Sequence, residues 1–205
     1  MARTLVADQS GRLARERILQ AALELFSERS YGGTSLAAIA KRVGLSQPGL
    51  LHHFSDKRSL LIAVLEERDR QDGQADEHGL YDGLTIAQTL EQMVRSTERN
   101  LGNRDAIRLA HVCGLASGEG AEAASEWSRR RLARMRAQIL ERGTAAQETG
   151  EIADTVDVEN LASVIIAAFL GLEHQWLLDE NFDMVGGMRA FTRMLAGELG
   201  VPGPA

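Results

Sequence analysis

Residues 34–57 have the sequence TSLAAIAKRVGLSQPGLLHHFSDK, and this stretch predicts two short helices joined by a tight turn. Its first two residues, Thr and Ser, both suit the cap of the first helix, because their hydroxyls can accept a hydrogen bond from its first turn. Gly44 is expected to end that helix, since glycine readily adopts the left-handed conformation found there. The second helix would begin at Ser46 or Gln47, with Pro48 tolerated in its first turn. This pattern is typical of a helix-turn-helix.

Apolar residues on either side of this stretch predict two more helices. The first has apolar side chains at positions 18, 21, 22, 25 and 26, the spacing of one helix face, and should end near residue 30 because two glycines follow. The other is expected over residues 56–71. A three-helix helix-turn-helix DNA-binding domain, extended by this last helix, is therefore expected over residues 11–70. Residues 1–10 show no periodicity, so we expect a flexible N-terminal arm.

The composition predicts an all-α protein of about nine helices. Alanine, leucine, glutamate and arginine are abundant and favour helices, whereas only three prolines occur among 205 residues. After a glycine-containing connection near residues 72–83, the apolar spacing predicts further helices at about 86–101, 107–114, 121–148, 157–181 and 184–199. Residues 71–205 are therefore expected to form a second, helical domain.

The charge is distributed unevenly along the chain. The net charge is −6, but residues 1–60 hold nine Lys and Arg against five Asp and Glu, a net of +4. Residues 61–205 hold fourteen against twenty-four, a net of −10. A basic segment joined to an acidic body fits a protein that presents one end to DNA.

Several other classes of protein lack support in the sequence. The single cysteine, Cys113, excludes an internal disulfide and a cysteine-based zinc site. No paired catalytic groups, metal-ligand spacing or phosphate-binding loop occurs, so we expect no enzyme, no metal and no cofactor. The N-terminus has no secretory signal, and the most apolar stretch, Leu161–Leu172, is shorter than the roughly 18 residues that cross a bilayer. A cytoplasmic protein without a membrane partner is expected.

Helical geometry predicts which residues of the second short helix face outward. Leu50 and Phe54 are four residues apart and are expected to be its buried pair. Pro48 and His52 then point away from the core, Gln47 lies at the tip, and Gly49, Leu51 and His53 lie on the flanks. Glutamine can bond base edges, leucine can contact a thymine methyl group, glycine allows close approach, and histidine can bond phosphates.

Lys57 is placed against the usual preference of a helix. A cation in the first turn opposes the helix dipole. A DNA phosphate at this helix N-terminus would reverse the sign of that interaction, with Lys57 and free backbone N–H groups converging on it. A solvated surface lysine is the alternative.

A series of short motifs with consistent spacing runs through the N-terminal segment: Ala21-Ala22-Leu23-Glu24-Leu25-Phe26, Tyr31-Gly32, Thr34-Ser35-Leu36, Ile39-Ala40, Val43-Gly44-Leu45-Ser46, Leu50, His53-Phe54 and Asp56-Lys57. Their resemblance to the tetracycline-repressor (TetR) family of bacterial regulators covers about 55 residues. It implies that the third helix enters the major groove, that Lys57 holds a phosphate, and that the protein is a homodimer built by its last two helices, usually with a small-molecule pocket.

The resemblance extends the set of expected DNA contacts and marks two departures. The expected contacts become Thr34, Ser35, Ser46, Gln47, Pro48, Gly49, Leu51, His52, His53 and Lys57. The family often has Tyr where this chain has Leu51, and Lys-Gly where it has Gln47-Pro48. These departures affect the operator sequence and the affinity rather than the fold.

The penultimate helix is apolar almost all round, which predicts that it is buried almost all round. A second copy of the chain could supply the covering layer, as an isologous four-helix interface, and a well-covered monomer core is the alternative. The interface residues expected from the apolar stripes of the last two helices are Leu161, Ile165, Leu172, Trp176, Phe191 and Leu195.

The resemblance implies a pocket for an unknown small-molecule effector among the helices of residues 71–205, which would make them an effector-binding and dimerisation domain. The residues expected to line it are Met93, Thr97, His111, Trp127, Arg131 and Phe169. The chain is thus predicted to be a transcriptional regulator, a repressor that its effector releases from a palindromic double-stranded operator. Two alternatives stay open: a DNA-binding regulator without a ligand, and a helical enzyme or carrier.

Overall fold

The computed structural model describes residues 2–71, 81, 83–114 and 121–203, which form nine helices and contain no strand. The chain divides into two compact units. The first comprises residues 1–75 and 108–128, and the second comprises residues 76–107 and 129–205. Of this range, residues 108–114 and 121–128 are described, and their buried apolar side chains belong to the core of the first unit, whereas the sequence-based division at residue 70 placed them in the C-terminal domain.

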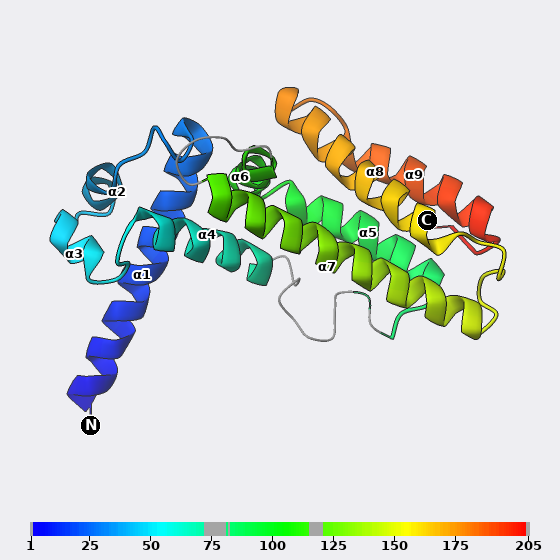
Figure 1. The fold of residues 1–205 in the computed structure, drawn as a ribbon, viewed down its shortest axis with the longest axis horizontal. Helices are drawn as coiled ribbons and strands as arrows, with labels where there is room; N and C mark the ends of the chain where they lie inside the picture. Colours follow the sequence, from blue (N-terminus) through cyan, green and yellow to red (C-terminus); the bar gives the residue numbers. More distant parts are fainter. Residues whose placement is uncertain (1, 72–80, 82, 115–120, 204–205) are drawn as a thin grey trace. The chain divides into compact units, whose positions relative to one another are not determined.

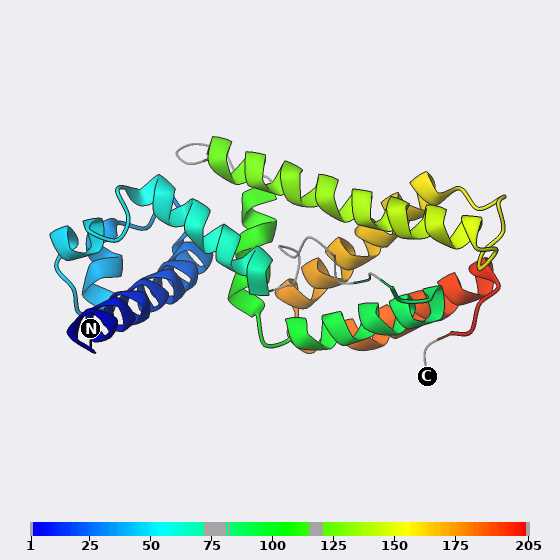
Figure 2. The same ribbon diagram turned by 90° about the horizontal axis from the view of Figure 1, so that it is seen from below.

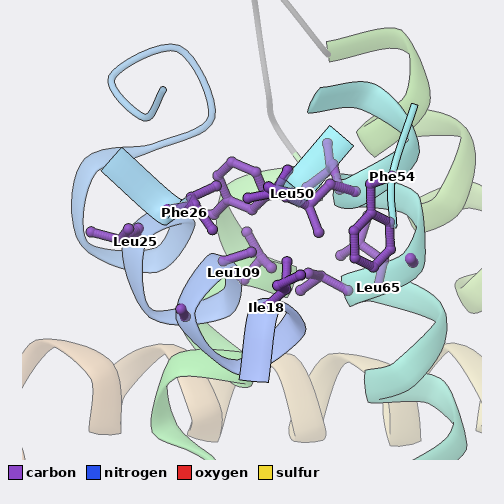
Figure 3. Packing of buried hydrophobic residues seen from close by; sticks show 14 of the residues in the cluster. Ile18, Leu25, Phe26, Leu50, Phe54, Leu65 and Leu109 are labelled. Carbon is purple, nitrogen blue, oxygen red and sulfur yellow. The ribbon is translucent and has the colours of Figure 1, made fainter. Parts of the chain in front are cut away.

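The first unit is built from α1 (Ala2–Arg29), α2 (Leu36–Arg42), α3 (Gln47–Leu51) and α4 (Lys57–Gln71) (Figure 1). It also takes in the end of α6 (Arg104–Gly114) and the start of α7 (Ala121–Glu148). One apolar core joins these helices, and Figure 3 shows its centre with Ile18, Leu25, Phe26, Leu50, Phe54, Leu65 and Leu109. All five apolar positions predicted for the inner face of the first helix are buried.

The start of α1 differs from the sequence-based expectation. The helix begins at Ala2, so residues 2–10 continue it, although the lack of apolar periodicity predicted no helix there. Apolar periodicity reports which side of a helix is buried and is absent where a helix buries little, so its absence did not exclude a helix. Residues 1–10 also contain no proline or glycine that would break one.

The turn between α2 and α3 forms as predicted, and its caps are now defined. Ser35 caps α2, and its Oγ accepts a hydrogen bond from the N–H of Ala38. Gly44 has a φ of +73°, and its N–H donates to the carbonyl of Lys41 while the next N–H, of Leu45, donates to Ala40. This pair of bonds is a Schellman motif, and its left-handed position favours glycine.

The second unit contains α5 (Ile86–Asn100), α8 (Val158–Leu178) and α9 (Met184–Leu199), with the remaining parts of α6 and α7. Figure 2 shows α5 running beside α9, and a shared apolar core joins both to α7 and α8. A Cβ added at Gly187 of α9 would lie 2.6 Å from Cδ2 of Leu172, so the absence of a side chain there lets α8 and α9 approach closely. Each predicted helix of this region is present, with ends shifted by a few residues.

Helix α8 is longer than the apolar stretch Leu161–Leu172 alone suggested. Its 21 residues are long and apolar enough to cross a membrane by length and composition, and no other helix in the described part of the chain meets that test. A single such helix is weak evidence for a membrane span, because core helices of soluble proteins pass the same test. Several of its apolar side chains are exposed, among them Val164 at 55% and Leu178 at 77%.

Candidate nucleic-acid interface

The short helix α3 is held in place by its cap and its apolar side. Ser46 is the N-cap, and its Oγ accepts a hydrogen bond of 3.2 Å from the N–H of Gly49. Leu50 is fully buried and Phe54, which follows the helix, is almost fully buried, as their spacing predicted. Because these two side chains fix the inner face, the opposite face of α3 is fixed in direction as well.

The outward face of α3 carries the residues that helical geometry predicted. Gln47, Pro48 and His52 are exposed, and Leu51 is 38% exposed. Gly49 and His53 are partly buried on the flanks. The face offers an amide that can donate and accept hydrogen bonds and a leucine that can contact a methyl group, and it carries no carboxylate. This combination suits the edges of base pairs in a major groove.

Thr34 does not belong to this surface. Its side chain is 3% exposed, and Oγ1 lies 2.9 Å from the carbonyl oxygens of both Leu25 and Ser30. The hydroxyl therefore donates to the end of α1 and fastens the turn that leads into α2. The DNA contact expected of Thr34 stays a prediction, and the burial of its hydroxyl against backbone carbonyls argues against it.

Ser35 and Ser46 remain accessible while capping α2 and α3. Both side chains are exposed, and each Oγ accepts one bond from a backbone N–H. A hydroxyl that accepts in this way keeps its own hydrogen for an outside acceptor. Both residues can therefore donate to a phosphate without giving up the cap.

Lys57 lies against an aromatic ring. Its Nζ is 4.2 Å from the centroid of the Tyr31 ring, a cation–π contact, and Tyr31 in turn packs at 5.5 Å on the ring of Phe26 in the core. The ammonium is therefore held by a side chain that is itself anchored. Sequence reasoning predicted a role for Lys57 but did not predict the support from Tyr31.

The N-terminus of α4 is already occupied by a carboxylate. Oδ1 of Asp56 accepts a bond of 2.6 Å from the N–H of Ser59, and Ser59 Oγ in turn accepts from the N–H of Asp56. The bonds from Ser59 lower the pKa of Asp56 below its ordinary value of 3.8. The N–H of Ser59 is thus taken by an internal cap, and Lys57 remains the candidate phosphate ligand.

Two arginines of α1 approach the helix-turn-helix and were not predicted. Arg17 Nη2 donates a bond of 2.8 Å to the carbonyl of Val43, the C-cap of α2. The guanidinium carbon of Arg15 lies 4.5 Å from the centroid of the Phe54 ring. The net positive charge of residues 1–60 was the available signal for both, although it did not identify which residues carry it to this surface.

The six predicted interface residues of α8 and α9 are largely used within one chain. Ile165, Trp176 and Leu195 are buried, and Leu161, Leu172 and Phe191 are partly buried against the same cores. The apolar side chains that remain exposed on these helices are Val164, Leu170, Leu178 and Met194. The stripes predicted from the sequence therefore face inward, and the exposed apolar positions lie between them.

The six predicted pocket residues fall into both compact units. His111 and Trp127 belong to the first unit, where Trp127 Nε1 donates to Asp69 at 3.1 Å. Met93, Thr97, Arg131 and Phe169 belong to the second. The buried hydroxyl of Thr97 donates to the carbonyl of Met93 within its own helix. The effector pocket stays a prediction.

No group of three metal-binding side chains occurs among the residues the structure describes.

The helix-turn-helix region matches known regulators in sequence. Residues 18–64 match the family described as bacterial regulatory proteins, tetR family. The tetracycline repressor protein class C of Escherichia coli is 40% identical over 55 residues, which are 27% of this chain and 25% of that protein. The chain thus covers only about a quarter of that relative's length.

Solved structures match nearly the whole chain in fold. A TetR transcriptional regulator from Chloroflexus aurantiacus has a TM-score of 0.76 at 21% identity, covering 93% of this chain and 97% of that one. The transcriptional regulator FadR from Bacillus subtilis, solved in complex with stearoyl-CoA, has a TM-score of 0.71 at 20% identity, covering 88% and 96%. The segment of residues 18–64 is thus that of the tetR family of bacterial regulatory proteins, and the solved structures show that nearly the whole chain shares their fold.

Proposed function

We propose that this chain is a sequence-specific DNA-binding transcription regulator whose α3 enters the major groove. The observation that carries the proposal is the outward face of α3, where Gln47, Pro48, Leu51 and His52 are exposed on a helix fixed by its buried side. A glutamine amide can pair with an adenine edge through two hydrogen bonds, and leucine can contact a thymine methyl group. The positive charge of residues 1–60 supports the same partner.

Selection of bound duplexes from random DNA tests this proposal, and it does not require the operator sequence to be known. The full chain is expected to enrich an inverted repeat whose half-sites lie about one helical turn, roughly 34–36 Å, apart, because two α3 helices of a dimer would enter successive major grooves. Recovery of no common sequence at a salt concentration where the protein binds DNA would contradict sequence-specific recognition.

The roles of Lys57 and His52 can be separated by their salt dependence. Each phosphate contact that is lost lowers the slope of log affinity against log salt by about one unit. Lys57→Ala is expected to lower the slope and weaken binding to all sequences, whereas His52→Ala should leave the slope closer to that of the wild type. Equal binding by wild type and Lys57→Ala at moderate salt would refute the phosphate role.

We also propose that the regulator is a homodimer joined through the exposed apolar side chains of α8 and α9. Val164, Leu178 and Met194 are 55%, 77% and 74% exposed, so a second copy can reach them. Exposed apolar surface of this kind is typical of protein interfaces. A two-fold axis would place the same helices of both protomers against each other.

Sedimentation equilibrium tests the dimer with a matched pair of variants. Wild type is expected to have twice the monomer mass, and Met194→Glu should dissociate it because a buried unpaired carboxylate costs several kcal/mol. Leu101→Glu serves as the control, since Leu101 is an exposed apolar residue at the C-cap of α5 instead of α8 or α9. A wild-type monomer at micromolar concentration would contradict the proposal.

We further propose that an apolar or amphipathic small molecule binds the second unit, near Met93, Thr97 and Phe169, and releases a repressor from its operator in the cytoplasm. The repressor name of the Escherichia coli relative and the stearoyl-CoA bound to FadR from Bacillus subtilis support this proposal. Linkage requires that operator DNA weaken ligand affinity by the factor by which ligand weakens DNA affinity. Calorimetry with stearoyl-CoA as the first probe measures the ligand affinity with and without operator. A compound that binds with equal affinity in both conditions is not an inducer. A regulator without a ligand would show no binding.

A further inference from the structure

Arg15 of α1 is held at the end of α3 by an aromatic side chain. Its guanidinium carbon lies 4.5 Å from the ring centroid of Phe54, which follows α3 and is buried in the core of the first unit. Phe54 is two positions after His52, one of the outward residues of α3. The stacking therefore fixes a permanent positive charge beside the surface that is proposed to contact DNA.

The contact with Phe54 leaves N–H groups of the guanidinium available. The guanidinium carbon lies over the ring, whereas the five N–H bonds point outward in the plane of the guanidinium itself. Among the residues that the structure describes, no carboxylate forms an ion pair with Arg15, and its side chain is exposed. By contrast, Arg17 donates to a backbone carbonyl and Arg42 pairs with Glu24 at 3.1 Å. The Arg15 guanidinium is thus held in position, and its N–H groups can donate hydrogen bonds to an anion.

The surroundings favour an anionic partner. Residues 11–18 contain three arginines and one glutamate, and Arg12 lies one turn before Arg15 on an exposed part of the same helix. Lys57 is held in the same way, over Tyr31, another aromatic residue packed against this core. Two cations fixed on anchored rings close to α3 suit acceptors at defined positions, which is how phosphates along a duplex are arranged.

We propose that Arg15 is a second anchoring residue for the DNA backbone, which binds a phosphate oxygen through the edge of its guanidinium while Phe54 supports its face. The proposal rests on the DNA binding proposed above. It adds α1 to the elements that contact DNA, and it assigns to Phe54 a positioning role in addition to its place in the core.

Fluorescence anisotropy of the full chain with a labelled random-sequence duplex tests the proposal, because non-specific binding depends mainly on phosphate contacts. Affinity is measured over a fourfold range of salt, from about 50 to about 200 mM, for wild type, Arg15→Gln, Arg15→Lys and Lys57→Ala. Arg29→Ala is the matched control, since Arg29 is an exposed arginine in the last turn of the same helix. Thermal unfolding of each variant confirms that it is folded.

Arg15→Gln is expected to lower the salt slope by about 0.9 for each protomer in contact, and each such loss makes the affinity fall about 3.5-fold less over this fourfold salt range. Arg15→Lys should keep the slope because it keeps the charge, and Arg29→Ala should match wild type. A wild-type slope and affinity for folded Arg15→Gln, alongside a loss for Lys57→Ala, would overturn the role of Arg15 and leave DNA binding intact. A wild type that binds no DNA would instead refute the proposed function.

Discussion

Replacing Thr34 by valine separates a structural role from a DNA contact. The side chain is 3% exposed, and its hydroxyl is within 2.9 Å of two backbone carbonyls at the end of α1. Valine has nearly the same shape but no donor, so a buried carbonyl oxygen loses its partner at a cost of about 1–3 kcal/mol. The added methyl group offsets up to about 0.8 kcal/mol. We therefore expect the first unit to lose about 1–2 kcal/mol of unfolding free energy.

Tryptophan fluorescence can follow the first unit alone. The chain has two tryptophans, and Trp127 lies in the first unit whereas Trp176 lies in the second. In a Trp176→Phe background, urea unfolding of Thr34→Val should show a midpoint lower by about 0.3–2 M, given a slope of about 1–3 kcal/mol per molar urea for small units. Thr34→Ser should restore the midpoint, because it restores the hydroxyl.

DNA binding supplies the result that would refute this reasoning. Under conditions where Thr34→Val is fully folded, its affinity for duplex DNA should equal that of wild type. A variant with wild-type stability and reduced DNA affinity would show that the Thr34 hydroxyl contacts DNA and not the carbonyls of Leu25 and Ser30.

Three further predictions concern the same unit. Hydrogen bonds from Ser59 lower the pKa of Asp56, so the stabilising effect of its carboxylate is present above the unfolded pKa near 3.8 and is lost as pH falls through the lower folded value. Asp56→Asn should therefore weaken the dependence of unfolding free energy on pH below about 4. An unchanged dependence on pH in this variant would contradict the prediction. Burial raises the pKa of Cys113 to about 11. Its thiol should therefore react slowly with a disulfide reagent at mildly alkaline pH and rapidly in denaturant. Fast reaction of the folded protein would show that the thiol is exposed. Tyr31→Leu should weaken DNA binding about two- to fivefold by removing the cation–π support of Lys57, and it should have no further effect in a Lys57→Ala background.

Local signals in the sequence predicted the helix-turn-helix well. Gly44 predicted a left-handed residue at the end of α2, and the spacing of Leu50 and Phe54 predicted a buried pair. The structure contains both features. Such features depend on residues a few positions apart. The burial of Thr34 and the cation–π contact of Lys57 with Tyr31 depend on how the turn after α1 folds back on the core, and residue spacing carries no information about that contact.

The last two helices show a different limit. The sequence does not distinguish the buried stripe, which includes Ile165 and Trp176, from an exposed residue such as Val164, because all are apolar positions on one helix. The difference between a core that the chain covers itself and an exposed apolar surface emerges only when α9 and the neighbouring helices are placed against α8. The inward stripe was consequently predicted as the interface, whereas Val164, Leu178 and Met194 are the exposed positions.

Recognition of bases by α3 is the central claim, and a thermodynamic cycle between Gln47 and the selected operator tests it most directly. Affinity is measured for wild type and Gln47→Ala on the selected duplex and on duplexes changed at one symmetric base pair of each half-site. If Gln47 reads that pair, Gln47→Ala should lose about 1–3 kcal/mol of discrimination there for each contact, and no discrimination at the other positions. An equal loss of affinity on every duplex, with base preferences unchanged, would contradict the claim that α3 reads the sequence through this residue.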